Sequence, residues 1–184
     1  MYTGTISMRY AKALLMFANE SGVAGQVYQE ALTLRKSFRE IPELRHTMEK
    51  PLMTKVNKTA LLEQASGGNI SQQMQKFFRL VIREKREKYL AYIIQSFIDL
   101  YRKQEKIRVG KLTTAVPIAT EEVERIRKIV VDSAGGPAEF TTKVDPSIEG
   151  GFIFEINTYR LDASVADQMR RIKQQFIEKN RRIV

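Results

Sequence analysis

The apolar residues of this chain change their spacing once, and this change constrains the fold more than any other feature. Up to about residue 105 they recur every three or four positions, which predicts helices that each bury one face. From Ile107 onward they alternate with polar residues, as in a strand buried on one side. The sequence therefore predicts a mainly α protein with a helical domain over residues 1–105 and a small α+β domain over residues 106–184.

The first domain is predicted to hold six short helices. Gly or Pro separates several of their apolar stripes, and both residues commonly end helices. We expect Ser7, Thr54 and Ser71 to cap the first, fourth and fifth helices, because a hydroxyl can accept a hydrogen bond from a free amide of the first turn. Since the connections are short, the six helices should form a bundle.

The second domain is predicted to follow the order β-α-β-β-β-α. Its first strand contains Gly110, which suggests a bulge. A helix should follow from Thr120, with three Glu residues in a first turn where they complement the helix dipole. Two strands are expected over residues 140–144 and 152–156, with a short return strand after them.

The turns of the second domain carry two marked pairs, to which we assign a structural role. These are Asp145-Pro146, which starts a turn, and Gly150-Gly151, which permits a tight turn and close packing. Ser164 and the acidic residue three positions later form a capping box for the last helix. Apolar residues of that helix are expected to face inward, namely Val165, Met169, Ile172 and Phe176.

The residue types exclude most catalytic chemistry. There is no Cys and a single His, His46, so disulfides and ordinary zinc sites are excluded, and His46 is expected to be an exposed structural residue. Neither common glycine-rich phosphate-binding motif is present. We therefore predict no catalytic residue, no metal and no cofactor. An enzyme built from scattered carboxylates remains as an alternative.

The net charge of +10 indicates an anionic partner. Residues 1–105 hold 17 basic and 10 acidic residues (+7), whereas residues 106–184 hold 14 and 11 (+3). Because no nucleic-acid-binding motif accompanies this charge, an acidic protein or a nearby anionic membrane surface is preferred over DNA. A basic helical adapter for nucleic acid is the alternative. No apolar run approaches the ~20 residues that cross a bilayer, and a mature cytoplasmic protein is expected.

The first helix is apolar on two faces. One stripe holds Ile6, Tyr10, Ala13, Leu14 and Phe17, and the other holds Ala11, Leu15 and Ala18. Such a helix is either central to a bundle or packs on the bundle with one face and on a partner with the other. The pattern leaves open which stripe faces outward.

Three segments in register resemble the δ subunit of bacterial F-type ATP synthases, the counterpart of the mitochondrial oligomycin-sensitivity-conferring protein. At the start, residues 8–18 resemble the opening motif R-x-Y-A-x-A. In the middle, Phe77 to Arg86 and then Phe97 resemble the apolar fifth helix of the family, its N-x-R turn and its sixth helix. At the end, residues 145–156 resemble D-P-S-L-I-G-G-F-V-V-R-I and residues 161–165 resemble I-D-G-S-V. The chain departs from the family at Glu84-Lys85-Arg86, where N-G-R is usual, and at Ala163, where Gly is usual. The turn at Ala163 therefore should not need a backbone conformation restricted to Gly.

The resemblance implies a stator subunit that performs no chemistry. A six-helix bundle would bind the amphipathic N-terminal helix of an α subunit of the catalytic head, between its first and fifth helices. The second domain would join the b subunits of the peripheral stalk. The protein would lie on the cytoplasmic face of the inner (plasma) membrane, in contact with it only through the complex. Carried over by position, the groove residues are Tyr10, Ala13, Leu14, Phe17, Phe77, Leu80 and Val81.

Overall fold

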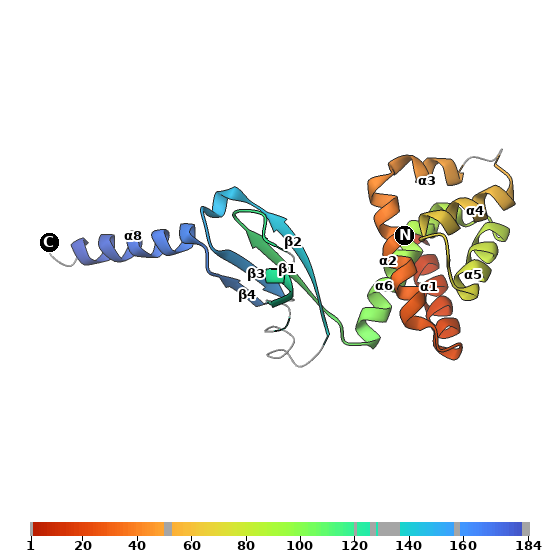
Figure 1. Ribbon diagram of the computed structural model, residues 1–184, viewed down its shortest axis with the longest axis horizontal. Helices are drawn as coiled ribbons and strands as arrows, with labels where there is room; N and C mark the ends of the chain where they lie inside the picture. The colour runs from red at the N-terminus through yellow and green to blue at the C-terminus, as the bar shows by residue number, and fades with distance from the viewer. Residues whose placement is uncertain are drawn as a thin grey trace. The chain divides into compact units, whose positions relative to one another are not determined.

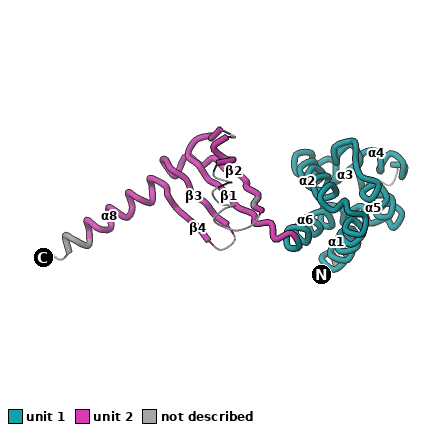
Figure 2. Tube along the Cα trace, turned by 60° about the horizontal axis from the view of Figure 1, so that its bottom comes forward, with its two compact units in different colours: residues 1–104 teal, residues 105–184 magenta. Residues whose placement is uncertain are grey.

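The computed structural model describes residues 2–49, 53–119, 121–125, 128, 137–156 and 159–181. Over these residues the chain is mainly helical and contains a small four-stranded mixed sheet (Figure 1). It divides into two compact units, unit 1 over Met1–Gln104 and unit 2 over Glu105–Val184 (Figure 2). The division lies beside the point where the spacing of apolar residues changes. The helical spacing of three or four residues therefore belongs to unit 1, and the alternating spacing begins in unit 2.

Unit 1 contains the helices α1 to α6 and one short 3-10 turn. Their bounds are α1 Tyr2–Glu20, α2 Ala24–Glu40, α3 Pro42–Glu49, α4 Lys55–Ala65, α5 Gln72–Arg83, η1 Glu87–Tyr89 and α6 Leu90–Gln104. The core lies where α6 packs on α1 and α2, and Phe78 and Phe97 are completely buried. Near this core Tyr28 stacks on Tyr101 with ring centres 4.4 Å apart.

Two of the three predicted helix caps are confirmed. The hydroxyl oxygen of Thr54 accepts a hydrogen bond from the Asn57 amide, and that of Ser71 accepts one from the Met74 amide, both at 3.3 Å. The prediction for Ser7 is wrong, because α1 already begins at Tyr2 and Ser7 lies inside it with 2% of its surface exposed. A serine ahead of an apolar run is typical of a helix cap, but a serine is also small enough to be buried inside a helix.

The connection from α5 to α6 contains a residue in the left-handed region. Lys85 has φ of 54°, at the central position of the Asn-Gly-Arg turn that the resembled family carries. A side chain at positive φ costs roughly 1–2 kcal/mol, which explains why Gly suits this position. Ala163, which also replaces a Gly of the family pattern, is not among the described residues with positive φ, as expected.

Unit 2 is built on a sheet with the strand order β2-β1-β3-β4 (Figure 1). The strands are β1 Arg108–Thr114, β2 Ala138–Val144, β3 Phe152–Ile156 and β4 Tyr159–Asp162, with the 3-10 turn η2 Pro146–Ile148 before β3 and the helix α8 Val165–Arg181 at the end. β1 pairs with β2 in parallel, and the other pairs are antiparallel. Residues 121–125 are helical, as predicted, whereas most of the helix expected after them lies outside the described residues.

Gly110 lies in regular register, so the predicted bulge is wrong. It faces Phe140 of β2 and Ile156 of β3 without an extra residue on β1. A Cβ at this position would lie 2.6 Å from the ring of Phe140 and 3.3 Å from that of Phe154. The glycine therefore makes room for two aromatic rings whose centres are 5.3 Å apart across β1.

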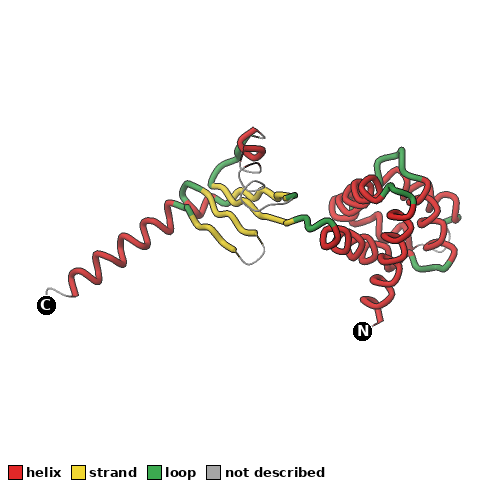
Figure 3. The backbone as a smooth tube through the Cα atoms, turned by 90° about the horizontal axis from the view of Figure 1, so that it is seen from below, coloured by secondary structure: helices red, strands yellow, loops and turns green. Residues whose placement is uncertain are grey.

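The apolar stripe of α8 faces solvent, contrary to the prediction. The exposed fraction is 40% for Val165, 60% for Met169, 46% for Ile172 and 64% for Phe176. Figure 3 shows α8 continuing beyond the strands of its own unit. The prediction of a helix is confirmed, but the spacing of its apolar residues does not show whether the apolar face packs on the same chain or on a partner.

Candidate functional site

The structure separates the two apolar faces of α1. Ser7, Ala11, Leu14 and Ala18 are buried against the bundle, whereas Ile6, Tyr10 and Phe17 are half-buried and Ala13 is exposed. Successive residues turn by 100° around a helix, so the four outer residues form one continuous stripe beside the buried one. The outward face of α1 is therefore the predicted stripe of Ile6, Tyr10, Ala13 and Phe17 without its fifth member, Leu14, which is buried together with Ala11 and Ala18.

Helix α5 supplies the other side of this surface. Leu80 is half-buried, while Phe77 and Val81 point into the core. The Nζ atom of Lys76 lies 6.0 Å from the centre of the Phe17 ring, which places α5 directly beside the outer stripe of α1. Lys76 was not among the predicted residues, although it lies one turn before Leu80 and so shares its face.

We call this surface the outer seam, and it consists of Ile6, Tyr10, Ala13, Phe17, Lys76 and Leu80. Four of the seven residues carried over from the family lie on it. The other three, Leu14, Phe77 and Val81, lie in the core of unit 1 with at most 5% of their surface exposed. Because they are buried, they can support the seam from below but offer almost no surface to a partner. Residues of the buried and the exposed stripe are neighbours in sequence, so a position carried over from the family can belong to either stripe.

The charge beside the outer seam is positive. Arg9 and Lys12 are exposed on α1, and Lys76 is exposed on α5. An apolar stripe with cationic neighbours fits an amphipathic helix whose flanks carry acidic side chains.

The Asp145-Pro146 turn of unit 2 is organised by a carboxylate. Asp145 accepts hydrogen bonds from the Ser147 hydroxyl at 2.6 Å, the Lys143 ammonium at 2.9 Å and the Ser147 amide at 3.2 Å. The hydroxyl of Ser147, followed by the Lys143 ammonium, lowers the pKa of Asp145 to about 2. The turn is therefore held by an ionised carboxylate.

A similar arrangement begins α8. The Ser164 hydroxyl donates to Asp162 at 2.6 Å and accepts from the amide of Asp167 at 3.2 Å. The first half of the predicted capping box is thus confirmed. The amide of Ser164 bonds to Asp162 instead of Asp167, and Asp167 pairs with Arg171 at 2.7 Å. The Ser164 hydroxyl is also the main cause that lowers the pKa of Asp162.

Acid should weaken unit 2 through Asp145. Because its pKa is lower in the folded state than in the unfolded chain, ionised Asp145 favours folding above about pH 4, and this contribution is lost as the pH falls toward about 2. We expect Asp145→Asn to be less stable than the wild type at neutral pH, with the difference disappearing over that range. Urea unfolding at a series of pH values measures this.

The matched variant for this experiment is Ser147→Ala, which removes the donor with the largest effect on the pKa of Asp145. In this variant the carboxyl resonance of Asp145 should titrate at a higher pH than in the wild type. If the free energy of unfolding of Asp145→Asn fell between about pH 4 and 2 by as much as that of the wild type, Asp145 would not be the cause of the acid sensitivity.

No three or more His, Asp or Glu side chains among the described residues are grouped so as to hold an ion. No helix in the described ranges is both long and apolar enough to cross a bilayer. A helical unit with a partly exposed apolar seam, joined to a sheet unit that carries an uncovered amphipathic helix, defines a two-domain protein that binds other proteins.

Comparisons with known proteins place the chain within this class. Residues 6–176 match the family described as ATP synthase delta (OSCP) subunit. The chain is 57% identical to ATP synthase subunit delta of Phocaeicola vulgatus and 50% identical to that of Bacteroides thetaiotaomicron, in both cases over the full length of both chains. A chain of the Toxoplasma gondii mitochondrial ATP synthase hexamer has the same fold, with a TM-score of 0.64 and 20% identity over 93% of this chain and 97% of that one.

The chain therefore belongs to the ATP synthase delta (OSCP) subunit family. The resemblance seen in the three sequence segments is confirmed. Members of this family are non-catalytic subunits of the ATP synthase and are peripheral to its membrane part.

Proposed function

We propose that this chain is a stator and coupling subunit of an F-type proton-translocating ATP synthase. Unit 1 binds the N-terminal helix of an α subunit at the outer seam, and unit 2 joins the b subunits of the peripheral stalk. The link keeps the catalytic head from turning with the rotor, so proton flow drives ATP synthesis. It operates on the cytoplasmic face of the plasma membrane and touches the membrane only through the complex. Family membership supports this function over the nucleic-acid adapter that the basic charge left open.

One observation carries the proposal for unit 1. The outer stripe of α1 is apolar but only partly buried, although the neighbouring stripe of the same helix is buried. Covering an aliphatic or aromatic side chain contributes roughly 1.5–3 kcal/mol, so three or four anchors can bind a helix after the ordering costs are met. Ala13 lies between the larger side chains and permits close approach of the partner backbone.

The exposed stripe of α8 supports the stalk attachment of unit 2. Ten of the fifteen large apolar side chains that are exposed among the described residues lie in unit 2, and five of these are on α8. Val165, Met169, Ile172 and Phe176 are separated by four, three and four residues, a spacing typical of helices that pack on other helices as coiled coils. The b subunits are the partners that this surface fits.

Replacing Ala13 with Asp should weaken binding of a peptide with the sequence of the α-subunit N terminus by at least about tenfold. The substitution places a charged and larger side chain at the centre of the outer seam, where a bound helix would have to remove it from water and could no longer approach closely. Isothermal titration calorimetry with the full chain measures the affinity, and circular dichroism shows whether the helices remain.

Met8→Asp is the matched control, because Met8 is exposed on α1 but lies about 160° around the helix from Ile6, away from the outer seam. It should bind the peptide like the wild type. Equal affinities of the Ala13→Asp and Met8→Asp chains would remove the outer seam from the interface.

A further inference from the structure

Unit 1 contains a polar cavity that the proposed function does not use. It lies where the end of α3, helix α4 and the connection from α5 to α6 meet, and its volume is about 350 Å³. The residues that line it are Met48, Lys58, Lys85, Glu87 and Lys88. We call this cavity the lysine pocket. None of its residues belongs to the outer seam.

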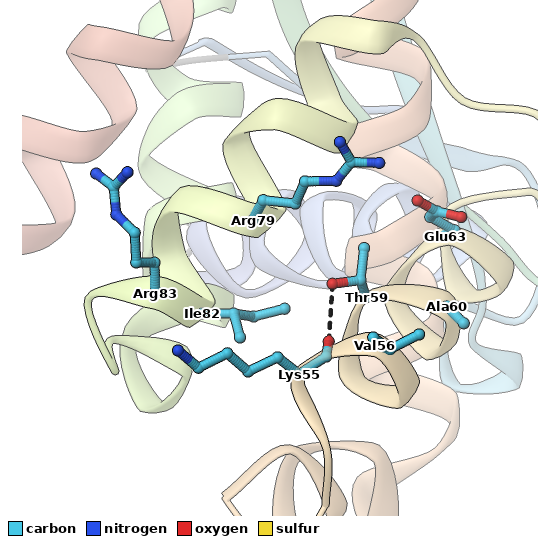
Figure 4. Close-up of a pocket in the computed structure, with 8 residues that line it drawn as sticks. All are labelled: Lys55, Val56, Thr59, Ala60, Glu63, Arg79, Ile82 and Arg83. Carbon is cyan, nitrogen blue, oxygen red and sulfur yellow. Dashed lines mark hydrogen bonds between the residues drawn. The ribbon is translucent and has the colours of Figure 1, made fainter.

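The lysine pocket is distinct from the cavity between α4 and α5. That cavity is lined from α4 by residues that include Lys55 and Thr59, and from α5 by Arg79 and Arg83 (Figure 4). The two cavities share no lining residue. Lys55 is therefore an exposed lysine of α4 that can serve as a control for the pocket.

Lys58 brings a buried charge into the lysine pocket. Only 7% of its surface is exposed, and its ammonium donates to the Glu87 carboxylate at 2.9 Å. An ammonium has three N–H donors, and Glu87 is the one acceptor that the Lys58 side chain has among the described residues. Because a buried charge is stabilised by the hydrogen bonds that it makes, a second acceptor inside the pocket would bind to Lys58 favourably.

Lys85 lines the same pocket from a backbone conformation that disfavours a side chain. Its φ of 54° lies in the left-handed region, which glycine adopts without strain. The Lys85 amide donates to the Ile82 carbonyl at 3.1 Å and the Arg86 amide donates to the Val81 carbonyl at 2.9 Å, and these bonds fix the turn. A strained residue at a position that suits glycine points to a role for its side chain.

The charge of the lysine pocket is positive. Three of its described lining residues are lysines and one is acidic, which leaves a net charge of +2. The ammonium of Lys88 lies 4.9 Å from the centre of the Tyr89 ring, a contact that does not neutralise it. Because Lys58 is buried while Lys85 and Lys88 are exposed, an anion that contacts all three must enter the pocket. The ligand is therefore small and anionic.

A phosphoryl group fits these conditions. It carries up to two negative charges and three strong acceptor oxygens, so different ammonium groups can bind different oxygens. Lysine binds phosphate as a point charge on a flexible stem and needs no fixed geometry. The volume is at the lower end of the roughly 300–1,000 Å³ that is typical of small-molecule sites, so the pocket can hold phosphate or a small phosphate ester.

We propose that the lysine pocket binds a phosphoryl group, either as inorganic phosphate or as the phosphate of a small molecule such as a nucleotide. The ligand links α4 to the connection between α5 and α6 through Lys58, Lys85 and Lys88. Since the pocket exists only in the folded unit, the ligand stabilises unit 1. This inference goes beyond the proposed function and does not depend on which proteins the two units bind.

The test titrates the full chain with sodium phosphate, and separately with ADP, at an ionic strength held constant with sodium chloride. The amide resonances of Lys58 and of residues 85–88 should shift and reach saturation. Lys85→Gly and Lys88→Met should each weaken binding by about five- to tenfold, because each removes one charged donor. The matched control is Lys55→Met, which should bind like the wild type.

Lys85→Gly separates binding from folding. Because glycine relieves the strain at this position, the variant without phosphate should unfold at the same temperature as the wild type or at a higher one. Phosphate should then raise its unfolding temperature by less than it raises that of the wild type. A lysine with a purely structural role would not give these opposite effects.

The two titrations distinguish the sources of the phosphoryl group. Saturation by phosphate alone supports the inference with free phosphate as the ligand, and tighter binding of ADP supports it with a nucleotide. The inference is wrong if neither compound shifts the resonances of the pocket. It is also wrong if Lys55→Met loses as much affinity as Lys85→Gly and Lys88→Met, because the general positive charge of unit 1 would then hold the anion.

Discussion

Gly151→Ala is expected to destabilise unit 2 by about 2–5 kcal/mol. Gly151 has φ of 70°, a conformation that costs a residue with a Cβ roughly 1–2 kcal/mol. An added Cβ would also overlap the backbone carbonyl oxygen of Ala163, which has no side-chain rotation to relieve the contact. Forced overpacking costs a further 1–3 kcal/mol or so, and the two effects act at the same atom.

The backbone around Gly151 leaves little room for adjustment. The Ala163 amide donates to Phe152 at 2.9 Å, and the Val165 amide donates to Gly150 at 3.1 Å. These bonds hold the start of β3 against the start of α8 on either side of the glycine. A movement that relieved the overlap would therefore break the contact that fixes the first turn of α8.

Two matched variants separate the causes of this effect. At Gly150 a Cβ would meet the side chain of Val165 at 2.9 Å, and this side chain can move, so Gly150→Ala should be milder. At Gly68 φ is also positive, but no atom lies within 4 Å of an added Cβ, so Gly68→Ala reports the conformational cost alone. Amide hydrogen exchange in the full chain should show faster opening of unit 2 in Gly151→Ala, with unit 1 unchanged. Equal effects of all three variants would contradict the role of the overlap.

The sequence predicts the elements of this fold well, because helical and strand periods are local. It also identifies the Gly150-Gly151 pair as a structural turn, but not which glycine is irreplaceable, since the overlapping atom belongs to a residue twelve positions away. Gly110 shows the same limit. A glycine inside a strand indicates a bulge or a close approach, and only the ring positions of Phe140 and Phe154 distinguish the two.

The outer seam could be predicted in outline but not in detail. The sequence shows that α1 is apolar on two faces, and the family resemblance adds α5, yet neither tells a buried stripe from an exposed one. Leu14 and Ala13 are neighbours in sequence, and their burial is decided by where the remaining helices pack. Leu80 is the position that the sequence alone can assign to an outer face, because it lies off the helical stripe that contains Phe77 and Val81.

The exposed apolar stripe of α8 shows why a sequence pattern cannot tell a helix face that packs on its own domain from one that packs on a partner. An isolated domain of this size is expected to bury most of its large apolar side chains, which predicts that Met169 and Phe176 lie in the core. Within unit 2 no helix or strand among the described residues covers them fully. In a subunit that joins two larger parts of an assembly, part of the hydrophobic core is supplied by the partners.

Glu30→Ala is expected to destabilise unit 1 by about 2–4 kcal/mol. The Glu30 carboxylate is buried and accepts hydrogen bonds from the Ser71 amide at 2.6 Å, the Ser71 hydroxyl at 2.8 Å and the Gln26 side-chain amide at 3.0 Å. Ser71 is the N-cap of α5, so a residue of α2 holds the start of a helix that contributes Lys76 and Leu80 to the outer seam. Removing the carboxylate leaves the Ser71 donors without their acceptor in a site that water barely reaches.

Two weaker substitutions test whether the carboxylate acts through α5. Glu30→Gln keeps the side-chain length and one acceptor oxygen, and Ser71→Ala keeps the backbone donor, so each should lose less stability than Glu30→Ala. In Glu30→Ala, hydrogen exchange should rise most in the first turn of α5, and peptide binding at the outer seam should weaken although no residue of the seam has changed. Stability lost evenly over unit 1, with unchanged peptide affinity, would show that Glu30 serves the bundle without positioning α5.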